Sequence, residues 1–318
     1  MTQTTAPPAL EGWFIAQAAR EATDSIDPAV ECGFALEADG RLHPLPANAP
    51  GTVVRWIPAS GWCPVLAPDD PRRDLLELYL PVSSATERNP ITVAHLGQSL
   101  DGFIATSSGD SCFVTGPQNI LHLHRLRALC DAVIVGARTV ETDNPRLTTR
   151  LVSGNNPLRV VLDPRSRLSA SHHIFSDGDA KTIRVVARGA SSSALTTPLR
   201  DNVIEVECVG NAMDLKDLVR QLHARGCWRI FVEGGGVTVS AFLEAGLLDR
   251  LHIAVAPLLI GEGRPAVRMA PRLRLKDCMK VKPRIYRTGE DVLFDCDLRA
   301  STAAVPESVT SAQVARVS

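Results

Sequence analysis

Residues 229–240, which read RIFVEGGGVTVS, carry the strongest chemical signal in the chain. An apolar run of strand length leads into Gly234, Gly235 and Gly236, and a segment of helical character follows. Glycines let the backbone approach a diphosphate closely, and the unpaired N–H groups at a helix start point towards it. The glycines lack the spaced G-x-G-x-x-G pattern, so an ordinary tight turn is the alternative interpretation.

Glu233 directly precedes these glycines. A carboxylate beside an anion-binding turn is unfavourable unless a cation or a hydrogen-bond donor faces it. We therefore expect Glu233 to be a substrate ligand, or else a surface carboxylate that is satisfied by Arg229.

Two further polar segments follow apolar runs. After residues 132–135 and Gly136, a predicted polar turn brings Arg138, Arg146 and Arg150 into one loop. Open α/β sheets bind ligands at the carboxyl ends of their strands, and guanidinium groups match phosphate oxygens. The arginines therefore predict phosphate recognition, with solvated surface charge as the alternative.

The second segment, residues 160–167, reads VVLDPRSR. Arg165 and Arg167 flank Ser166 at the end of a strand, where a dinucleotide site can hold a 2′-phosphate. This favours NADP over NAD, and an ordinary proline-containing turn is the equal alternative.

The elements that must position these residues form an α/β pattern from residue 90 onward. Strands of this alternating kind form a mostly parallel sheet with helices on both faces. A turn at residues 287–290 predicts a C-terminal antiparallel hairpin. We expect strands at 91–95, 132–135, 158–162, 182–187, 203–206, 228–232 and 251–256, helices at 118–129, 214–225 and 237–245, and hairpin strands at 280–286 and 291–298.

The chain divides into three predicted parts: an N-terminal extension over 1–89, a main domain over 90–299, and a disordered tail over 300–318. Prolines punctuate the first part, which predicts a small irregular unit without a catalytic motif. Within it we expect short helices at 11–23 and 74–80 and short strands at 33–36 and 53–57.

Composition excludes several classes of protein. The 318 residues have a formal net charge of −1, with 34 basic and 35 acidic residues, so a nucleic-acid partner is not expected. No pair of the eight cysteines forms a CxxC motif, which argues against a zinc site and favours reduced thiols. The sequence contains no signal-peptide pattern and no membrane-spanning run, so we expect a cytoplasmic protein without a membrane partner.

An ordered set of short motifs resembles a known family. The motifs are HLGQSLDGFIA (95–105), SGDSCFVTG (108–116), HRLRA (124–128), GARTV (136–140), DNPRLT (143–148), VLD (161–163), VEGG (232–235), GLLD (246–249) and APLLIG (256–261). Together they resemble the reductase domain of the bifunctional riboflavin biosynthesis deaminase/reductase, over residues 90–298.

The resemblance implies a three-layer dihydrofolate-reductase-like α/β fold and assembly with a second copy into a homodimer. It implies NADPH-dependent reduction of 5-amino-6-(5-phosphoribosylamino)uracil, a small phosphorylated pyrimidine. Glu233 and His95 then become catalytic candidates. The implied substrate positions are Ser111, Arg127, Leu147, Arg150 and Glu233, and the implied cofactor positions are Phe113, Thr139, Asp143, Pro164 and residues 235–241, with Gly235, Gly236, Val237 and Thr238 at their start.

The sequence departs from the family pattern at three positions. His95 replaces a common lysine, and it can donate a proton near neutral pH or serve only as a structural residue. Phe113 replaces a tryptophan. Pro164 replaces a residue with a hydroxyl group, whose hydrogen-bonding role could be taken over by Arg165, Ser166 or Arg167. Residues 1–89 also lack the zinc-ligand signature of the deaminase half, so neither deamination nor zinc is expected.

Two alternative functions stay open at this stage. The first is an NADPH-dependent reductase of another pterin-, folate- or pyrimidine-like substrate on the same fold. The second is a catalytically silent ligand-binding protein, for which the His95 replacement and the N-terminal extension are the only support.

Overall fold

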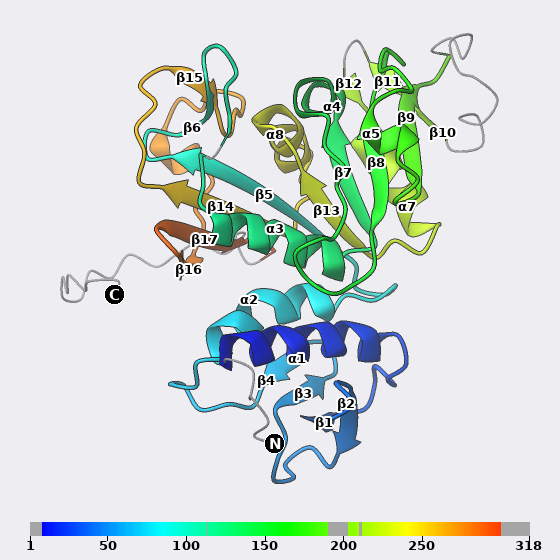
Figure 1. Ribbon diagram of the computed structural model, residues 1–318, viewed down its shortest axis with the longest axis vertical. Coiled ribbons are helices and arrows are strands. Elements are labelled where there is room, and N and C mark those ends of the chain that lie inside the picture. Colours follow the sequence, from blue (N-terminus) through cyan, green and yellow to red (C-terminus); the bar gives the residue numbers. More distant parts are fainter. Residues whose placement is uncertain (1–7, 113, 190–202, 210–211, 300–318) are drawn as a thin grey trace.

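The computed structural model describes residues 8–112, 114–189, 203–209 and 212–299. Figure 1 shows a small N-terminal unit stacked beneath a larger α/β unit. The predicted tail over 300–318 and Phe113 lie outside the described residues. Along the part of the chain that is described, no helix is long and apolar enough to cross a bilayer.

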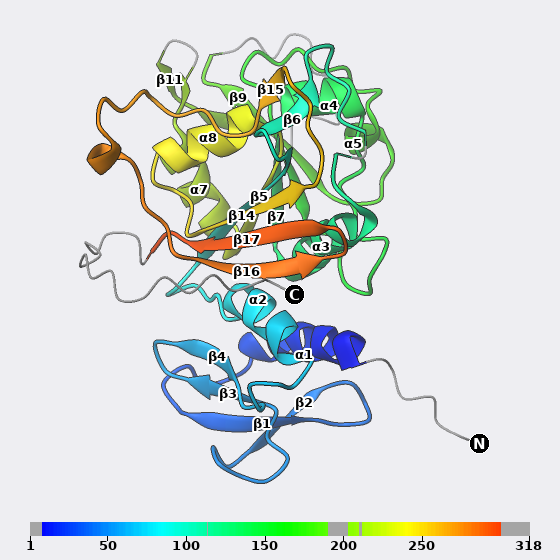
Figure 2. The ribbon, with the colours of Figure 1, turned by 90° about the vertical axis from the view of Figure 1, so that its left-hand side faces the viewer.

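The N-terminal unit is a four-stranded antiparallel sheet covered by two helices. The strand order is β2-β1-β3-β4. The two helices lie between this sheet and the larger unit (Figures 1 and 2). The elements are α1 (Pro8–Thr23), β1 (Cys32–Leu36), β2 (Leu42–Leu45), β3 (Val54–Ile57), β4 (Gly61–Pro64) and α2 (Arg73–Ser83).

The prediction of an irregular unit is therefore wrong, although the two short helices and the strands near 33–36 and 53–57 are confirmed. The missed strands β2 and β4 contain Pro44 and Pro64, and both strands lie at the edges of the sheet. Proline cannot donate to a ladder of hydrogen bonds, but an edge strand tolerates it. Helix α2 also contains a proline, Pro81, within its length.

The larger unit is built on a nine-stranded sheet of order β10-β9-β8-β7-β13-β5-β14-β17-β16. The strands from β10 to β14 are parallel, and the hairpin of β16 and β17 adds two antiparallel strands at one edge. The strands are β5 (Ile91–Ser99), β7 (Ala132–Gly136), β8 (Leu158–Leu162), β9 (Thr182–Ala187), β10 (Val203–Val206), β13 (Arg229–Glu233), β14 (Arg250–Ala256), β16 (Pro283–Thr288) and β17 (Asp291–Asp297).

The mostly parallel α/β fold and the C-terminal hairpin are confirmed. Shorter elements complete the unit, and several of them were not predicted. The helices are α3 (Pro117–Leu129), α4 (Ala137–Asp143), α5 (His173–Ser176), α7 (Leu215–His223), α8 (Gly236–Glu244) and the 3₁₀ turn η2 (Leu275–Asp277), and the short strands are β6 (Phe103–Thr106), β11 (Cys208–Val209), β12 (Ala212–Met213) and β15 (Gly263–Pro265).

Helix α4 replaces the polar turn that was predicted after Gly136. Its residues contain no glycine or proline, and Gly136 is the N-cap. The helix ends where Asn144 takes a left-handed conformation, with φ at 42°, and Pro145 follows. A left-handed cap followed by proline is a regular way to terminate a helix.

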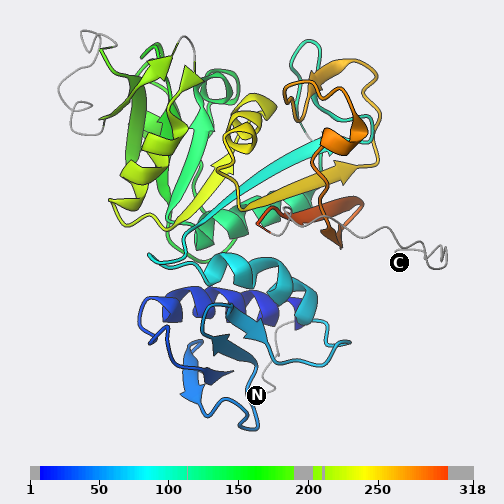
Figure 3. The same ribbon diagram turned by 180° about the vertical axis from the view of Figure 1, so that it is seen from behind.

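The two faces of the large sheet pack against separate hydrophobic cores. Along β7, Val133 and Val135 belong to one core, while Ala132 and Ile134 belong to the other. This alternation is the period-two pattern of a sheet that is buried on both faces. Helix α3 covers the first face, and α7 and α8 cover the opposite face (Figure 3). The described part of the large unit is therefore a three-layer sandwich.

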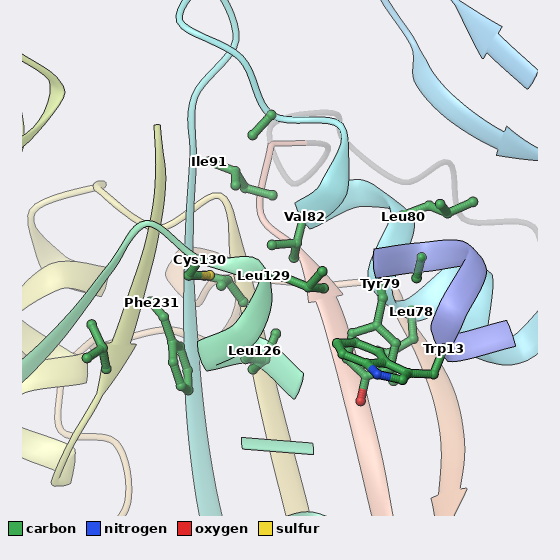
Figure 4. Packing of buried hydrophobic residues seen from close by; sticks show 14 of the residues in the cluster. Trp13, Leu78, Tyr79, Leu80, Val82, Ile91, Leu126, Leu129, Cys130 and Phe231 are labelled. Carbon is green, nitrogen blue, oxygen red and sulfur yellow. The ribbon is translucent and has the colours of Figure 1, made fainter. Parts of the chain in front are cut away.

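The first core continues without a break into the N-terminal unit. Trp13 and Leu80 from α1 and α2 belong to the same cluster as Leu126 of α3 and Phe231 of β13 (Figure 4). Burial of these side chains stabilises both units through shared apolar contacts. The two units therefore depend on one another for stability.

The shared core predicts a single unfolding transition. Leu129, which is fully buried on the α3 side, should cost about 2–5 kcal/mol when it is replaced by alanine. Three of the four tryptophans, Trp13, Trp56 and Trp62, lie in the N-terminal unit, and Trp228 lies in the large unit. Tryptophan fluorescence and far-UV circular dichroism should therefore shift together in Leu129→Ala, and separated transitions would contradict a shared core.

Candidate active site

A cavity of about 1310 Å³ opens at the carboxyl ends of the central parallel strands. His95 of β5, Gly136 of β7, Leu162 of β8 and Glu233 of β13 all line it. Open parallel sheets bind ligands at this edge. The volume exceeds that of an ordinary site for one small ligand, so it has room for a dinucleotide and a second molecule.

One wall of the cavity is the glycine turn before α8. Gly235 is the N-cap of this helix and receives no side-chain cap. A Cβ atom on Gly236 would lie 1.9 Å from the backbone oxygen of Ala266, and one on Gly136 would lie 2.6 Å from Thr238 Oγ1. The backbone contact makes glycine necessary at position 236, whereas the Thr238 side chain would have to rotate to admit a Cβ at position 136. The uncapped N–H groups of a helix start suit a diphosphate, so the turn fits the expected cofactor.

A row of polar side chains crosses three neighbouring strands next to the glycine turn, and two of its members, Glu233 and His95, line the cavity. Glu233 of β13 pairs in register with His95 of β5, which pairs with His252 of β14. All three residues follow the alternation that points them to the α3 face of the sheet. Polar groups at this depth need partners, because an unpaired buried polar group costs several kcal/mol.

Helix α3 supplies a partner to Glu233. Arg127 Nε donates to Glu233 Oε2 at 2.7 Å, Nη2 donates to Oε1, and Nη1 donates to the carbonyl oxygen of Thr148 at 3.1 Å. Burial alone would lower the pKa of Arg127, but the charge and hydrogen bonds of Glu233 raise it above its ordinary value. Arg127 therefore orients the Glu233 carboxylate towards the cavity.

The alternative in which Arg229 satisfies Glu233 is wrong. Arg229 points to the other end of β13, where its guanidinium lies 3.5 Å from Asp131 and 3.4 Å from Asp24. Four residues separate Arg229 from Glu233 along an extended strand, so the two side chains are too far apart to pair.

His95 is buried at the cavity floor as a neutral imidazole. Its Nε2 lies 2.8 Å from Asn119 Oδ1, and Asn119 Nδ2 donates to Thr115 Oγ1 at 2.8 Å. Because the amide oxygen accepts, Nε2 carries the proton. Burial, together with the smaller effect of nearby His252, lowers the pKa of His95 to about 3. An imidazolium at this position is therefore not available at neutral pH.

The three arginines that were predicted to cluster in one loop lie in different surroundings in the structure. Arg138 lies on α4 and lines the cavity, whereas Arg146 pairs with Asp179 at 3.1 Å. Arg150 is exposed, and its Nη1 donates to Thr148 Oγ1 at 2.7 Å. Neither Arg127 nor Arg150 belongs to the cavity lining, although both lie behind or beside Glu233.

The remaining candidate residues gather around the cavity. Burial raises the pKa of Asp143, and the charge of Arg264 opposes that shift. Leu147 is buried with a left-handed φ of 51°. The lining includes Ser111, Thr139, Asp143, Leu147, Pro164, Gly235, Gly236, Val237 and Thr238, while Phe113 lies outside the described residues.

The turn after β8 is organised by a buried carboxylate. Asp163 accepts hydrogen bonds from the backbone N–H groups of Arg167 at 3.1 Å and Leu168 at 3.0 Å. Ser166 takes a left-handed φ of 50°. The turn presents Arg167 at the rim of the cavity, where it also lies 3.3 Å from Glu141.

Sequence reasoning missed Asn119, Lys216 and Arg264, which all line the cavity. Asn119 lies three residues before His122 on α3, so its helical spacing offered a signal. Arg264 reaches the cavity because β15 pairs with β6, where Arg264 is opposite Ala105. No local pattern in the sequence predicts that β15 pairs with β6.

The fold and the cavity define an α/β protein of the dihydrofolate-reductase-like class. The family model of the RibD C-terminal domain matches residues 90–287, and the chain belongs to that family. A similar protein is the 2,5-diamino-6-ribosylamino-4(3H)-pyrimidinone 5′-phosphate reductase of Methanothermobacter thermautotrophicus, which is 32% identical over 65% of this chain and 97% of its own length.

Longer relatives match over part of their length. The chain spans 58% of the riboflavin biosynthesis protein RibD of Aquifex aeolicus, at 30% identity over 66% of the chain. It also resembles the solved deaminase/reductase of Thermotoga maritima, with a TM-score of 0.56 and 26% identity over 71% of this chain and 61% of that one. RibD of Acinetobacter baumannii shares the fold over 92% of this chain and 99% of its own, with a TM-score of 0.58 and 21% identity.

Substitution of Gly236 tests the glycine turn. In Gly236→Ala the new Cβ would overlap the backbone oxygen of Ala266, so α8 must move and dinucleotide affinity should fall at least about tenfold. Gly235→Ala should lose less, because its Cβ would meet nothing closer than 3.7 Å. Titration of NADPH fluorescence measures both affinities, and equal losses would contradict the packing argument.

The buried histidines predict a loss of stability in acid. The pKa of His95 is about 3, and burial also lowers the pKa values of His122 and His252. Below pH 6.5 the unfolded chain therefore binds protons that the folded chain does not, so stability falls as the pH drops from about 6.5.

The depressed pKa of His95 should contribute up to about 1.4 kcal/mol per pH unit between about pH 5.5 and pH 4, and the lowered pKa values of His122 and His252 act in the same direction. Urea denaturation at several pH values measures the slope for wild type, His95→Gln and, as an exposed control, His173→Gln. The slope should decrease in His95→Gln alone. An unchanged slope in that variant would show that His95 is not held neutral.

Proposed function

We propose that the chain is an NADPH-dependent reductase that converts 5-amino-6-(5-phosphoribosylamino)uracil to its ribitylamino product in riboflavin biosynthesis. The observation that carries the proposal is that Glu233, fixed by Arg127, and the glycine turn that follows it line one cavity. The family supports it, since its archaeal members are named as reductases of a phosphorylated ribosylaminopyrimidinone.

The names of these relatives favour a second candidate substrate. The archaeal reductases are named for 2,5-diamino-6-ribosylamino-4(3H)-pyrimidinone 5′-phosphate, which carries an amino group where the uracil substrate carries an oxygen. Both molecules share the ribosylamino phosphate that would undergo reduction. A site that reads the pyrimidine edge through one carboxylate, Glu233, could distinguish them by their hydrogen-bonding groups.

The cofactor is assigned to the wall formed by α8 and α4. Gly235, Gly236 and Val237 would hold the diphosphate with backbone N–H groups, and Thr139 and Asp143 line the space beside them. Arg167 and Lys216 are cations of the same cavity that could receive a 2′-phosphate, which supports NADPH over NADH. A reduced nicotinamide supplies the two electrons of the reaction.

The substrate is assigned to the wall that carries the polar row. Glu233, fixed by Arg127, would accept hydrogen bonds from the pyrimidine or from a ribose hydroxyl. Arg150, beside that pair, would attract the substrate phosphate at the cavity rim. Reduction of the open-chain imine also requires one proton at its nitrogen. His95 is neutral and its Nε2–H is engaged by Asn119, so a water is the proton donor in this proposal.

The proposal extends to assembly and location. We place the protein in the cytoplasm as a homodimer, in keeping with the family resemblance. Leu259, Leu273 and Leu275 are exposed by 71%, 98% and 88% respectively on the segment that precedes the edge strand β16. Exposed leucines beside an unpaired sheet edge are a suitable surface for a second copy of the chain.

The decisive assay follows NADPH absorbance at 340 nm with each of the two pyrimidine phosphates, with NADH in parallel. We expect NADPH oxidation, and we expect Glu233→Gln to lower kcat/KM about 10- to 100-fold, because it weakens a charge-assisted contact. Glu262→Gln, an exposed carboxylate outside the cavity lining, is the matched control.

Three outcomes would redirect the proposal. Turnover with another pterin, folate or pyrimidine alone would change the substrate. NADPH binding without oxidation of any substrate would favour a silent binding protein. Wild-type kinetics in Glu233→Gln would remove Glu233 from the site.

A further inference from the structure

A buried chain of polar side chains runs from the N-terminal unit into the large sheet. It begins at Tyr79 of α2, whose hydroxyl lies 2.7 Å from His122 Nδ1. His122 Nε2, on α3, lies 3.1 Å from His252 Nδ1 on β14. His252 Nε2 then lies 3.2 Å from Asp295 Oδ1 on β17. The four side chains are all buried.

The charges at the far end fix the proton arrangement of the chain. Burial would raise the pKa of Asp295, but His252 and Arg250 lower it to about 2. Arg250 forms a two-point ion pair with Asp295, and Arg284 lies 3.2 Å from the same carboxylate. Asp295 is therefore ionised. His252 Nε2 lies 3.2 Å from this carboxylate without the geometry of a hydrogen bond, and the adjacent negative charge favours the tautomer of neutral His252 that carries its proton on Nε2.

The remaining protons follow in order. With its proton on Nε2, His252 accepts at Nδ1, so the proton of His122 lies on Nε2. His122 Nδ1 then accepts from the Tyr79 hydroxyl. Burial lowers the pKa values of both histidines, which keeps them neutral. Among the described residues no group of side chains is placed to hold a metal ion.

The orientation of Tyr79 is itself fixed by the N-terminal unit. Its ring meets Trp13 edge to face at 5.5 Å, and the two residues lie together in Figure 4. The guanidinium of Arg125 lies over both rings, 5.4 Å from Trp13 and 5.7 Å from Tyr79. The hydroxyl that reaches His122 therefore comes from a packed and rigid ring.

His122 in turn adjoins the cavity floor. Its ring packs against His95 with centroids 5.3 Å apart. Asn119, which accepts a hydrogen bond from His95, lies three residues before His122 on the same face of α3. Any change in the tautomer or tilt of His122 is therefore transmitted to both members of the His95–Asn119 pair, and these two residues line the cavity.

We propose that the N-terminal unit completes the reductase site: Tyr79 is a positioning residue that acts through His122 to hold His95 and Asn119 at the cavity floor. This inference rests on the proposed function for its kinetic consequence, although the linkage itself is a property of the chain. It assigns residues 8–89 a role in catalysis beyond shared stability.

The test compares two removals of a buried tyrosine hydroxyl in the full-length protein. Tyr79→Phe removes the donor to His122. Tyr286→Phe is the matched control, because its hydroxyl is buried on β16 against the same core and has no hydrogen-bond partner among the described residues. Both variants are assayed below the onset of their thermal unfolding.

Three measurements are made on each variant. In Tyr79→Phe we expect kcat/KM for the pyrimidine to fall about tenfold, while the NADPH dissociation constant stays within about twofold, since α8 packs on the other core. Long-range ¹⁵N correlation spectra of labelled histidines should show shifted ring signals for His122 and His95. Tyr286→Phe should match wild type in all three.

Unchanged His95 signals and unchanged kinetics in Tyr79→Phe would overturn the inference and leave the proposed function intact. Lower thermal stability without histidine shifts would also overturn it, because Tyr79 would then be only a structural residue. If wild type itself oxidises no NADPH, the proposed function fails. The histidine spectra would still decide whether Tyr79 controls His95.

Discussion

The organisation of this protein depends on a row of polar side chains in the middle of a parallel sheet. Glu233, His95 and His252 stand side by side on β13, β5 and β14, on the face of the sheet that α3 covers. Unpaired, they would cost more free energy than the burial of several methyl groups provides. Helix α3 provides a hydrogen-bond partner for each of them: Arg127 for Glu233, Asn119 for His95 and His122 for His252. Three polar pairs thus set the position of α3 on the sheet.

The sequence predicted most of the main domain because buried parallel strands appear as uninterrupted apolar runs. The strands at 158–162, 182–187 and 203–206 agree with the structure residue for residue. The pattern failed where tertiary contacts decide. Edge strands tolerated prolines in the N-terminal sheet, β15 formed only because β6 lies beside it, and α4 replaced a predicted turn.

The candidate site was predictable to a similar extent. The glycine turn and Glu233 were visible as local motifs, and both line the cavity. The pairing of Glu233 with Arg127 was not visible, because the two residues lie 106 positions apart in the sequence. By its spacing alone, Arg127 is only a charged residue on a predicted helix. The pKa of His95 likewise depends on burial by other elements. Local sequence identifies reactive groups, but the long-range fold determines their ionisation and their partners.

The cavity lies where two separate hydrophobic cores meet. The glycine turn and α8 rest on one core, while the polar row, α3 and the N-terminal unit rest on the other. The helices α4 and α8 both line the cavity, but α4 packs on the first core and α8 on the second. A substitution deep in either core can therefore shift one wall of the cavity without placing any new atom inside it.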